Sequence, residues 1–300
     1  MKSIIDEIKR LKKEKDAVIL VHNYQRPEIQ DIADYIGDSL DLSKRAASID
    51  CEIIVFCGVR FMAESAKILS PDKTVLLPRL DAGCPMADMV TVAELKELKS
   101  QYPDATVVSY VNTNADVKAE SDVCCTSANA VKVIQNIKAN KIIFTPDRNL
   151  ANWVQRFTNK EIIPWNGYCY VHEGMEPDVV KLAKDLHRDA KLIVHPECRK
   201  EVVDLADEVL STSGMVKFAK ESDTNKIIIG TEEGIIYRLK KENPDKTFYT
   251  AGPPRMCRNM KLTTLKDVLF ALREDKYKIE IPEPIIQKAK IALDRMLEYT

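Results

Sequence analysis

The sequence predicts an α/β protein in which three repeated small α/β (αβα) domains place parallel sheets around a pseudo-threefold axis. Short strands rich in β-branched residues alternate with helical stretches, which is the pattern of right-handed βαβ units. Three times, a polar residue at a strand end is followed 17 positions later by a hydroxyl residue. The pairs are His22 and Ser39, Tyr110 and Ser127, and His195 and Thr212. The strand-end residues lie 88 and 85 positions apart, a period that suits small domains rather than a solenoid.

The first unit follows a charged amphipathic helix. Helix 1–15 places Ile4, Ile8 and Leu11 on one face, which indicates a docking stripe. Strand 53–56 is a run of Ile, Val and Phe, and the loop 79–86 contains Gly and Pro. The other expected elements are strand 17–21, helices 28–36, 39–48 and 61–69, strand 74–77 and a bridging helix 91–101.

The second and third units repeat this order. Their second strands end 36 residues after the first strand-end residue, as in the first unit. The second unit has strands 105–110, 141–144 and 160–163 and the loop 165–172. The third has strands 191–194, 226–229 and 246–249 and the loop 251–258, and helices 264–273 and 283–298 follow. We expect domains at 1–102, 103–188 and 189–262, with a C-terminal helical extension, 263–300, packing back on the repeats.

The composition limits the range of partners and locations. Hydrophobic residues make up 45% and charged residues 30% of the chain, as in soluble globular proteins. The net charge of −1 predicts no nucleic-acid partner and no membrane partner. Helix 1–15 lacks the apolar core of a signal peptide, and no apolar run reaches membrane-spanning length. We therefore expect a cytoplasmic protein whose eight cysteines are reduced.

Three cysteines occupy equivalent places in the three units. Cys84, Cys169 and Cys257 follow the strand-end residues by 62, 59 and 62 positions and lie in loops near Gly or Pro. A pseudo-threefold arrangement would bring these thiols together on the axis, where they suit an iron–sulfur cluster or zinc. A four-iron cluster with three ligands keeps one open iron, which acts as a Lewis acid. We interpret the other cysteines as packing residues: Cys51, Cys57, Cys124, Cys125 and Cys198.

Polar side chains mark the strand ends and the helix starts. Six residues at positions i and i+2 of the strand ends should face one central volume, because ligands collect at the carboxyl ends of parallel strands. Together they form a proton-transfer set: His22, Tyr24, Tyr110, Asn112, His195 and Glu197. Ser39, Ser127 and Thr212 are expected as helix N-caps. Helix starts with free N–H groups would bind a small, multiply anionic substrate.

Taken together, these motifs resemble those of the quinolinate synthase family over nearly the whole chain. The matching segments are Val-His22-Asn-Tyr24-Gln, Gly37-Asp-Ser39, Cys84-Pro-Met86, Tyr110-Val-Asn112, Thr126-Ser127-Ala-Asn129-Ala, Pro146-Asp-Arg-Asn-Leu150, His195-Pro-Glu197-Cys198, Ser211-Thr212 and Cys257. The resemblance implies an enzyme of NAD (pyridine nucleotide) biosynthesis, a transferase that condenses iminosuccinate with dihydroxyacetone phosphate to quinolinate, phosphate and water. It also implies a transient contact with the upstream iminosuccinate-forming enzyme.

The resemblance also implies the cofactor and the site residues. The cofactor is a [4Fe–4S] cluster on Cys84, Cys169 and Cys257 with one open iron. The implied substrate-binding residues are His22, Ser39, Tyr110, Asn112, Ser127, His195, Glu197 and Thr212. Tyr24 matches the tyrosine with an acid–base role, and we expect the catalytic set to be Tyr24, Glu197, His22, His195 and Tyr110.

Other functions fit the same thiols. An aconitase-type hydro-lyase also uses three cysteines and an open iron, and would act on a hydroxy diacid alone. A non-catalytic iron–sulfur sensor or electron carrier would keep its function after Tyr24→Phe or Glu197→Gln. A structural zinc protein would give a colourless preparation.

Overall fold

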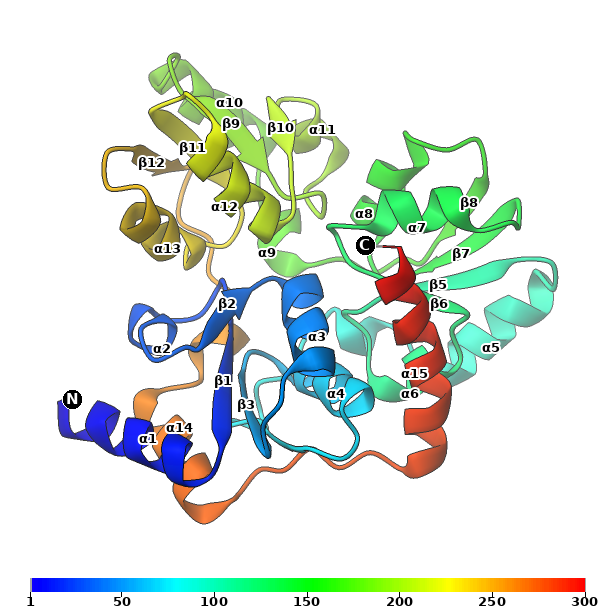
Figure 1. Cartoon of the computed structure of the whole chain (residues 1–300). Helices are drawn as coiled ribbons and strands as arrows, with labels where there is room; N and C mark the ends of the chain where they lie inside the picture. Colours follow the sequence, from blue (N-terminus) through cyan, green and yellow to red (C-terminus); the bar gives the residue numbers. More distant parts are fainter. Residues whose placement is uncertain (1, 300) are drawn as a thin grey trace.

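The computed structural model describes residues 2–299 and contains three sheets of four parallel strands (Figure 1). The strand orders are β2-β1-β3-β4, β6-β5-β7-β8 and β10-β9-β11-β12, so each sheet has the same topology. Helices cover the sheets in every unit. The predicted fold class is therefore confirmed as three repeated αβα units.

The first unit is blue to cyan in Figure 1. Its central strands β1 and β3 are buried runs of Val, Ile, Leu and Phe, as expected for a sheet covered on both faces. Its strands are β1 (Ala17–His22), β2 (Tyr35–Gly37), β3 (Ile53–Cys57) and β4 (Thr74–Leu76). Its helices are α1 (Lys2–Glu14), α2 (Pro27–Gln30), α3 (Ser39–Ser48) and α4 (Arg60–Leu69), followed by the 3₁₀ turn η1 (Ala87–Met89).

The second unit is reached through α5 (Val92–Gln101), which begins with a capping box between Thr91 and Glu94. Leu95 of this helix packs in one buried cluster with Val107 and Ile143 of the second sheet. The strands are β5 (Thr106–Tyr110), β6 (Val123–Cys125), β7 (Lys141–Thr145) and β8 (Glu161–Pro164). The helices are α6 (Ala115–Ala119), α7 (Ala130–Asn136), α8 (Arg148–Gln155) and α9 (Tyr170–Glu173).

The third unit begins after α10 (Pro177–Leu186) and is yellow-green in Figure 1. Its strands are β9 (Lys191–Val194), β10 (Glu208–Val209), β11 (Lys226–Gly230) and β12 (Thr247–Thr250). Its helices are α11 (Lys200–Val203), α12 (Thr212–Glu221) and α13 (Ile235–Glu242), followed by the 3₁₀ turn η2 (Asn259–Lys261). The division at 1–102, 103–188, 189–262 and 263–300 stays our proposal for the domain boundaries.

Each unit contains one strand that the sequence analysis missed. The expected helix 28–36 is wrong at its C-terminal end, because α2 ends at Gln30 and residues 35–37 form the edge strand β2. The segments 123–125 and 208–209 form the equivalent strands β6 and β10. These segments are only two or three residues long, too short for a period to distinguish strand from helix.

An aspartate repeated in all three units holds each of these edge segments to the central strand. Asp34, Asp122 and Asp207 each lie 12 residues after the strand-end residue. Their carboxylates accept the backbone N–H groups of Ile19, Val107 and Leu192 at 2.7–2.8 Å. Their own N–H groups donate to the carbonyl oxygens of the same three residues. This two-way contact starts the parallel pairing of the first two strands in each sheet.

The C-terminal helices pack on the first two units. Helix α14 (Leu265–Glu274) contacts α1, and its buried Val268 and Leu272 share a cluster with Ile8 of α1. Helix α15 (Glu283–Glu298), red in Figure 1, packs against α6, β6 and α4. The expected stripe on α1 is therefore a docking face, and both C-terminal helices return to the repeats.

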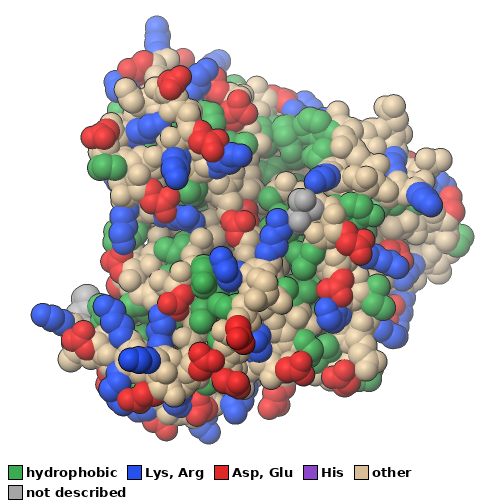
Figure 2. All heavy atoms as spheres, viewed as in Figure 1, with side chains coloured by type: hydrophobic (Ala, Val, Ile, Leu, Met, Phe, Trp, Pro, Cys, Tyr) green, Lys and Arg blue, Asp and Glu red, His purple; other side chains and the backbone are tan. Residues whose placement is uncertain are grey.

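The surface has no dominant charge. In Figure 2, Lys and Arg side chains alternate with Asp and Glu over the visible face, in line with the net charge of −1. No helix within residues 2–299 combines the length and apolar character that crossing a membrane requires.

Candidate active site

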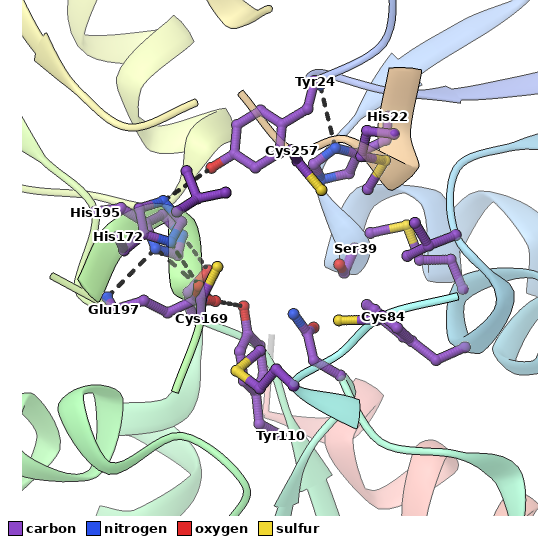
Figure 3. Close-up of a pocket in the computed structure, with 18 of the residues that line it drawn as sticks. His22, Tyr24, Ser39, Cys84, Tyr110, Cys169, His172, His195, Glu197 and Cys257 are labelled. Carbon is purple, nitrogen blue, oxygen red and sulfur yellow. Dashed lines mark hydrogen bonds and ion pairs between the residues drawn. The ribbon is translucent and has the colours of Figure 1, made fainter. Parts of the chain in front are cut away.

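A pocket lies where the carboxyl ends of the central strands of all three units face one another (Figure 3). Because the three sheets share one topology, residues at equivalent strand ends reach the same space. All the sequence-predicted site residues line this pocket: His22, Tyr24, Ser39, Cys84, Tyr110, Asn112, Ser127, Cys169, His195, Glu197, Thr212 and Cys257. Among residues 2–299, its lining includes no lysine or arginine.

The hydroxyl residues lie at helix starts, but the expectation that they are the N-caps is wrong. Asp38 caps α3 by accepting the N–H groups of Leu40 and Asp41, and Ser211 caps α12 by accepting that of Gly214. The preceding residue caps each helix because its backbone is still extended there. The hydroxyls at the first helical positions, Ser39 and Thr212, therefore line the pocket instead of capping the helix.

Ser127 and Asn112 complete the polar lining from the second unit. Ser127 lies three residues before α7, whose N-cap is Asn129. The side-chain oxygen of Asn112 is buried and has no hydrogen-bond partner within the described chain. An unpartnered buried acceptor is costly, so this oxygen is suited to a donor that a bound substrate supplies.

His22 and His195 share one local geometry. The ring Nδ1 of each accepts the backbone N–H of the residue two positions later, at 3.2 Å from Tyr24 and 3.3 Å from Glu197. Burial lowers the pKa of both histidines to about 3, so both are neutral near pH 7. With Nδ1 accepting, the proton is on Nε2. Nε2 of His195 lies 3.2 Å from the Ser127 hydroxyl and donates to it.

A chain of hydrogen bonds connects side chains from the three units. Tyr110 donates to Oε1 of Glu197 at 2.5 Å, and Oε2 of Glu197 lies 2.7 Å from Nδ1 of His172. The Thr231 hydroxyl is 2.8 Å from Nε2 of His172 and also bonds to the Tyr24 hydroxyl. The ionised Glu197 accepts from Nδ1–H of His172, and the Thr231 hydroxyl bonds to both Nε2 of His172 and the Tyr24 hydroxyl. The chain therefore forms a continuous path for proton transfer between Tyr24 and Glu197.

The pKa values in this network separate an ionised carboxylate from neutral phenols. Burial raises the pKa of Glu197, but attraction to His195 and His172 and the hydrogen bonds that it accepts bring the pKa down to about 2. Burial, with the negative charge of Glu197, raises the pKa of Tyr24 and Tyr110 well above the usual value of 10.0. The site therefore holds one ionised carboxylate, which can accept a proton, and two protonated phenols, which can donate one.

The three cysteine loops carry the same backbone contact. In each unit the residue 38 positions after the strand end donates its N–H to the carbonyl of the residue two positions before the cysteine. The pairs are Arg60 and Ala82 at 2.8 Å, Arg148 and Gly167 at 2.9 Å, and Glu233 and Arg255 at 2.9 Å. The predicted register of the cysteines therefore has a structural cause, since one contact fixes each loop just after the end of β3, β7 or β11.

Contacts between the loops bring the thiols to one pocket. The Asn259 amide donates to the Gly83 carbonyl at 2.7 Å, and the Arg258 N–H donates to the Tyr170 hydroxyl at 2.8 Å. Figure 3 shows the sulfur atoms of Cys84, Cys169 and Cys257 around the cavity. Burial raises the pKa of the Cys84 thiol to about 12, and it raises those of Cys169 and Cys257 as well.

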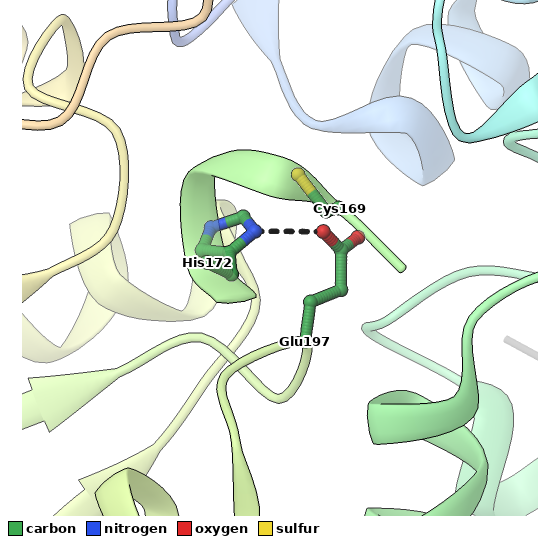
Figure 4. Close-up of side chains that lie close together, drawn as sticks. All are labelled: Cys169, His172 and Glu197. Atoms are coloured by element: carbon green, nitrogen blue, oxygen red, sulfur yellow. Dashed lines mark hydrogen bonds and ion pairs between the residues drawn. The ribbon is translucent and has the colours of Figure 1, made fainter. Parts of the chain in front are cut away.

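One compact group of possible metal ligands includes a thiol from this set. The ligand atoms of Cys169, His172 and Glu197 lie within 4.8 Å of one another (Figure 4). Among the described residues 2–299, the sulfurs of the three loop cysteines do not all lie within that distance. The other five cysteines are buried away from the pocket lining, as the sequence indicated: Cys51, Cys57, Cys124, Cys125 and Cys198.

Sequence reasoning missed two members of the hydrogen-bonded chain. His172 follows Cys169 by three residues, and the intervening turn α9 brings both side chains to the pocket. Thr231 is the third-unit residue 36 positions after the strand end, a register that the sequence displays. A search of this repeat position, 36 residues after each strand end, for side chains that form hydrogen bonds would have found Thr231. For His172, the available signal was its position three residues, about one helical turn, after Cys169, which recurs in all three units.

Comparisons with known proteins agree with this site. A family model described as "Quinolinate synthetase A protein" matches residues 6–298. A protein of Thermodesulfovibrio yellowstonii named "Quinolinate synthase" is 56% identical over 294 residues, which cover 98% of this chain and 97% of the relative. Another with that name, from Geotalea uraniireducens, is 58% identical over 291 residues, which cover 97% of this chain and 96% of the relative.

The chain belongs to the quinolinate synthase family. The resemblance carried by the sequence motifs is therefore confirmed. A third relative named "Quinolinate synthase", from Geobacter sp. strain M21, is 57% identical over 291 residues, which cover 97% of this chain and 96% of the relative. Apart from the segment 146–150, every motif segment of the family resemblance contributes a residue to one pocket, and these segments come from all three units.

Proposed function

We propose that this protein condenses iminosuccinate with dihydroxyacetone phosphate to give quinolinate, phosphate and water, a step of NAD biosynthesis in the cytoplasm. The observation that carries this proposal is the hydrogen-bonded chain from Tyr24 to Tyr110 beside three converging thiols. Carbon–carbon bond formation followed by ring closure requires repeated proton transfers, for which such a chain is suited. Because imines hydrolyse in water, the upstream iminosuccinate-forming enzyme is a transient partner in this proposal.

The residues fit a [4Fe–4S] cluster held by Cys84, Cys169 and Cys257. Three thiols from three loops line one buried cavity, and thiolates are the usual ligands of such clusters. A single tetrahedral zinc ion would bring its sulfur ligands to about 3.8 Å from one another, whereas among the described residues these three sulfurs do not all lie within 4.8 Å of one another. When bound, a cluster with one open iron supplies a Lewis acid that polarises the substrate.

The polar lining orients a substrate that carries carboxylates. In this proposal, the starts of α3 and α12 and the hydroxyls of Ser39 and Ser127 bind carboxylate oxygens, since helix starts offer free N–H groups. His195 donates to Ser127 and so leaves the Ser127 hydroxyl proton free for the substrate. Asn112 accepts from the imine or amine N–H. Fixed orientation of two reactants accounts for much of the rate gain in a condensation.

Tyr24 is the acid–base residue of this proposal. We assign Tyr24 as the donor in its hydrogen bond with Thr231, so that its oxygen lone pairs accept a substrate proton while its own proton moves through Thr231 toward His172. Glu197 stabilises the charge that forms on His172, and Tyr110 holds Glu197 in place. His22 offers its Nε2–H to the pocket and positions Tyr24, whose backbone N–H it accepts.

The test is quinolinate formation by the anaerobically purified protein. We expect Tyr24→Phe, Glu197→Gln and Thr231→Val to lower kcat by about 100-fold or more, the usual range for loss of an acid–base group. Thr231→Ser keeps the hydroxyl and serves as the matched control with near-wild-type activity. Full activity of Tyr24→Phe and Glu197→Gln would contradict the proposal and favour a sensor or electron carrier. Turnover of a hydroxy diacid alone would favour a hydro-lyase.

Iron and sulfide are measured on the same preparations. We expect about four iron and four sulfide per chain, lost in Cys84→Ala, Cys169→Ala and Cys257→Ala but kept in Cys51→Ala. Cys51 is buried in the first unit and does not line the pocket. A wild-type protein that binds zinc or no metal would refute the cluster.

A further inference from the structure

Asp147 is a fully buried carboxylate that holds two backbone N–H groups. One oxygen accepts from Leu150 at 2.7 Å and so caps α8, while the other accepts from Cys169 at 3.1 Å. Asp147 lies in the segment 146–150, one of the motifs that carry the family resemblance. Asp147 therefore connects the start of one helix to the loop that carries a pocket thiol.

Glu232 does the same in the third unit. Its side chain is fully buried, with one oxygen accepting from Gly234 at 2.7 Å and the other from Cys257 at 3.0 Å. The Lys261 ammonium also pairs with these two oxygens, at 3.1 and 2.9 Å. Asp147 and Glu232 occupy one repeat position, 37 residues after Tyr110 and His195 respectively. In the first unit this position is Val59, which has no acceptor and makes no side-chain cap.

The two contacts need a carboxylate. Only a carboxylate offers two acceptor oxygens, whereas an amide of the same shape turns one of them into a donor. In Asp147→Asn or Glu232→Gln, one backbone N–H would face an NH₂ group in a buried setting, where an unsatisfied donor is costly. Asp147 and Glu232 differ in length but supply the same two acceptor oxygens at the same position of the repeat.

We propose that Asp147 and Glu232 are positioning residues that fix the amides of Cys169 and Cys257, so that these two thiols are held in place before any cluster binds. The inference rests on the proposed ligand role of these cysteines. The Cys84 loop lacks this carboxylate contact and is held by the backbone contact shared by all three loops and by the Asn259 amide at the Gly83 carbonyl. The three proposed ligands are thus unequal, with two fixed by carboxylates and one not.

The first measurement uses the protein stripped of metal. Alkylation of each cysteine is followed by peptide mass spectrometry in the wild type and the two variants. We expect Asp147→Asn to speed alkylation of Cys169 several-fold and Glu232→Gln to do so for Cys257, with Cys84 unchanged in both. General destabilisation would speed all three thiols alike, so this selectivity separates positioning from folding.

The second measurement is the rate at which the anaerobic, cluster-loaded protein releases iron to a chelator. We expect each variant to release iron about 10-fold faster, as for other residues that orient metal ligands. The matched control is Asp122→Asn: Asp122 also accepts a backbone N–H, but one oxygen suffices for that contact, and it holds no cysteine.

The outcomes separate this inference from the proposed function. If the wild type binds no cluster, the proposed cofactor fails, while the alkylation result still tests the positioning role. Wild-type alkylation and iron release in both variants would overturn the inference. Should an amide variant not fold, Asp147→Glu and Glu232→Asp keep two acceptors at a changed reach. If Asp147→Glu and Glu232→Asp fold but alkylate Cys169 and Cys257 at the wild-type rate, the positioning role is overturned as well.

Discussion

The two pocket histidines are neutral because they are buried, and this has a cost at low pH. Unfolded histidine has a pKa near 6.5, whereas that of His22 and His195 is about 3 in the folded chain. Between these values the unfolded state binds more protons than the folded state. The contribution of these two histidines to the free energy of unfolding is therefore complete above pH 6.5 and is lost as the pH falls toward 3.

We predict that the urea midpoint responds to a change from pH 7 to pH 5 differently in the wild type and in His22→Asn and His195→Asn, with the wild type losing more stability relative to either variant. Each buried histidine makes the free energy of unfolding decline by up to about 1.4 kcal/mol per pH unit in this window. The window lies above the range in which Glu197 titrates. His187→Asn, outside the pocket, is the control, and an equal pH slope in all variants would refute this explanation.

At the residue scale, the sequence could predict the site wherever the repeat marks it. His22, Tyr110 and His195 end equivalent strands, so their convergence follows from the fold. Thr231 was not found, because its partner, Tyr24, comes from another unit and no sequence spacing encodes that contact. Ser39 was expected as a cap because the sequence does not show which of two adjacent polar residues has an extended backbone.

At the element scale, the repeated aspartates explain how such short edge strands form. The strand β10 has only two residues, and its pairing with β9 depends on the neighbouring Asp207. The hydrogen bonds of these aspartates replace part of the usual backbone pairing between two strands. The edge strand can therefore be short, and its own sequence pattern is weak. Helix 28–36 was predicted too long for this reason, since the deciding contact involves Asp34 and a residue 15 positions earlier.

We predict that Asp122→Ala lowers the free energy of unfolding by about 1 kcal/mol, the usual value of one partly buried hydrogen bond. Val107 would lose the acceptor of its N–H group. Asp122→Asn retains an acceptor and should recover most of the loss in a urea titration. The exposed Asp72 provides a control substitution, Asp72→Ala, which should change stability little. Equal stability of Asp122→Ala and the wild type would contradict the assigned role.

At the scale of the whole molecule, α15 closes the core between the first two units. Its buried residues include Ala289, Leu293 and Met296, and they share the largest apolar cluster with α4 and the second sheet. Near its C-terminal end, the Met296 carbonyl accepts the Asn129 amide at 3.2 Å, and Arg295 donates to the Asp122 carbonyl at 2.7 Å. The helix is therefore part of the fold and not an appendage.

We predict that Leu293→Ala lowers the free energy of unfolding by about 3 kcal/mol, because a fully buried leucine leaves a cavity. Ile291 lies on the same helix but is 55% exposed, so Ile291→Ala should cost well under 1 kcal/mol. Chemical unfolding of both variants under the same conditions gives the comparison. Similar losses in the two variants would show that α15 does not contribute through this face.

The pseudo-threefold arrangement was predictable from spacing alone, because three equal offsets left little freedom in how the units correspond. The residue pairs that form contacts between units were not predictable from spacing. Asn23 donates to Thr212 and Ser211 donates to Asp38, contacts that join the first and third units across more than 170 residues. Such contacts follow from packing in three dimensions and leave no periodic trace in the chain.

The division of the pocket among three units also bears on biogenesis. With one proposed ligand thiol on each unit, the centre cannot be filled until Cys257, the last of the three in the sequence, has been synthesised. Helix α15, which lies across the first two units, is translated later still. With the proposed ligands, the cofactor would be delivered only after all three units have been synthesised, and its presence would report that they have assembled.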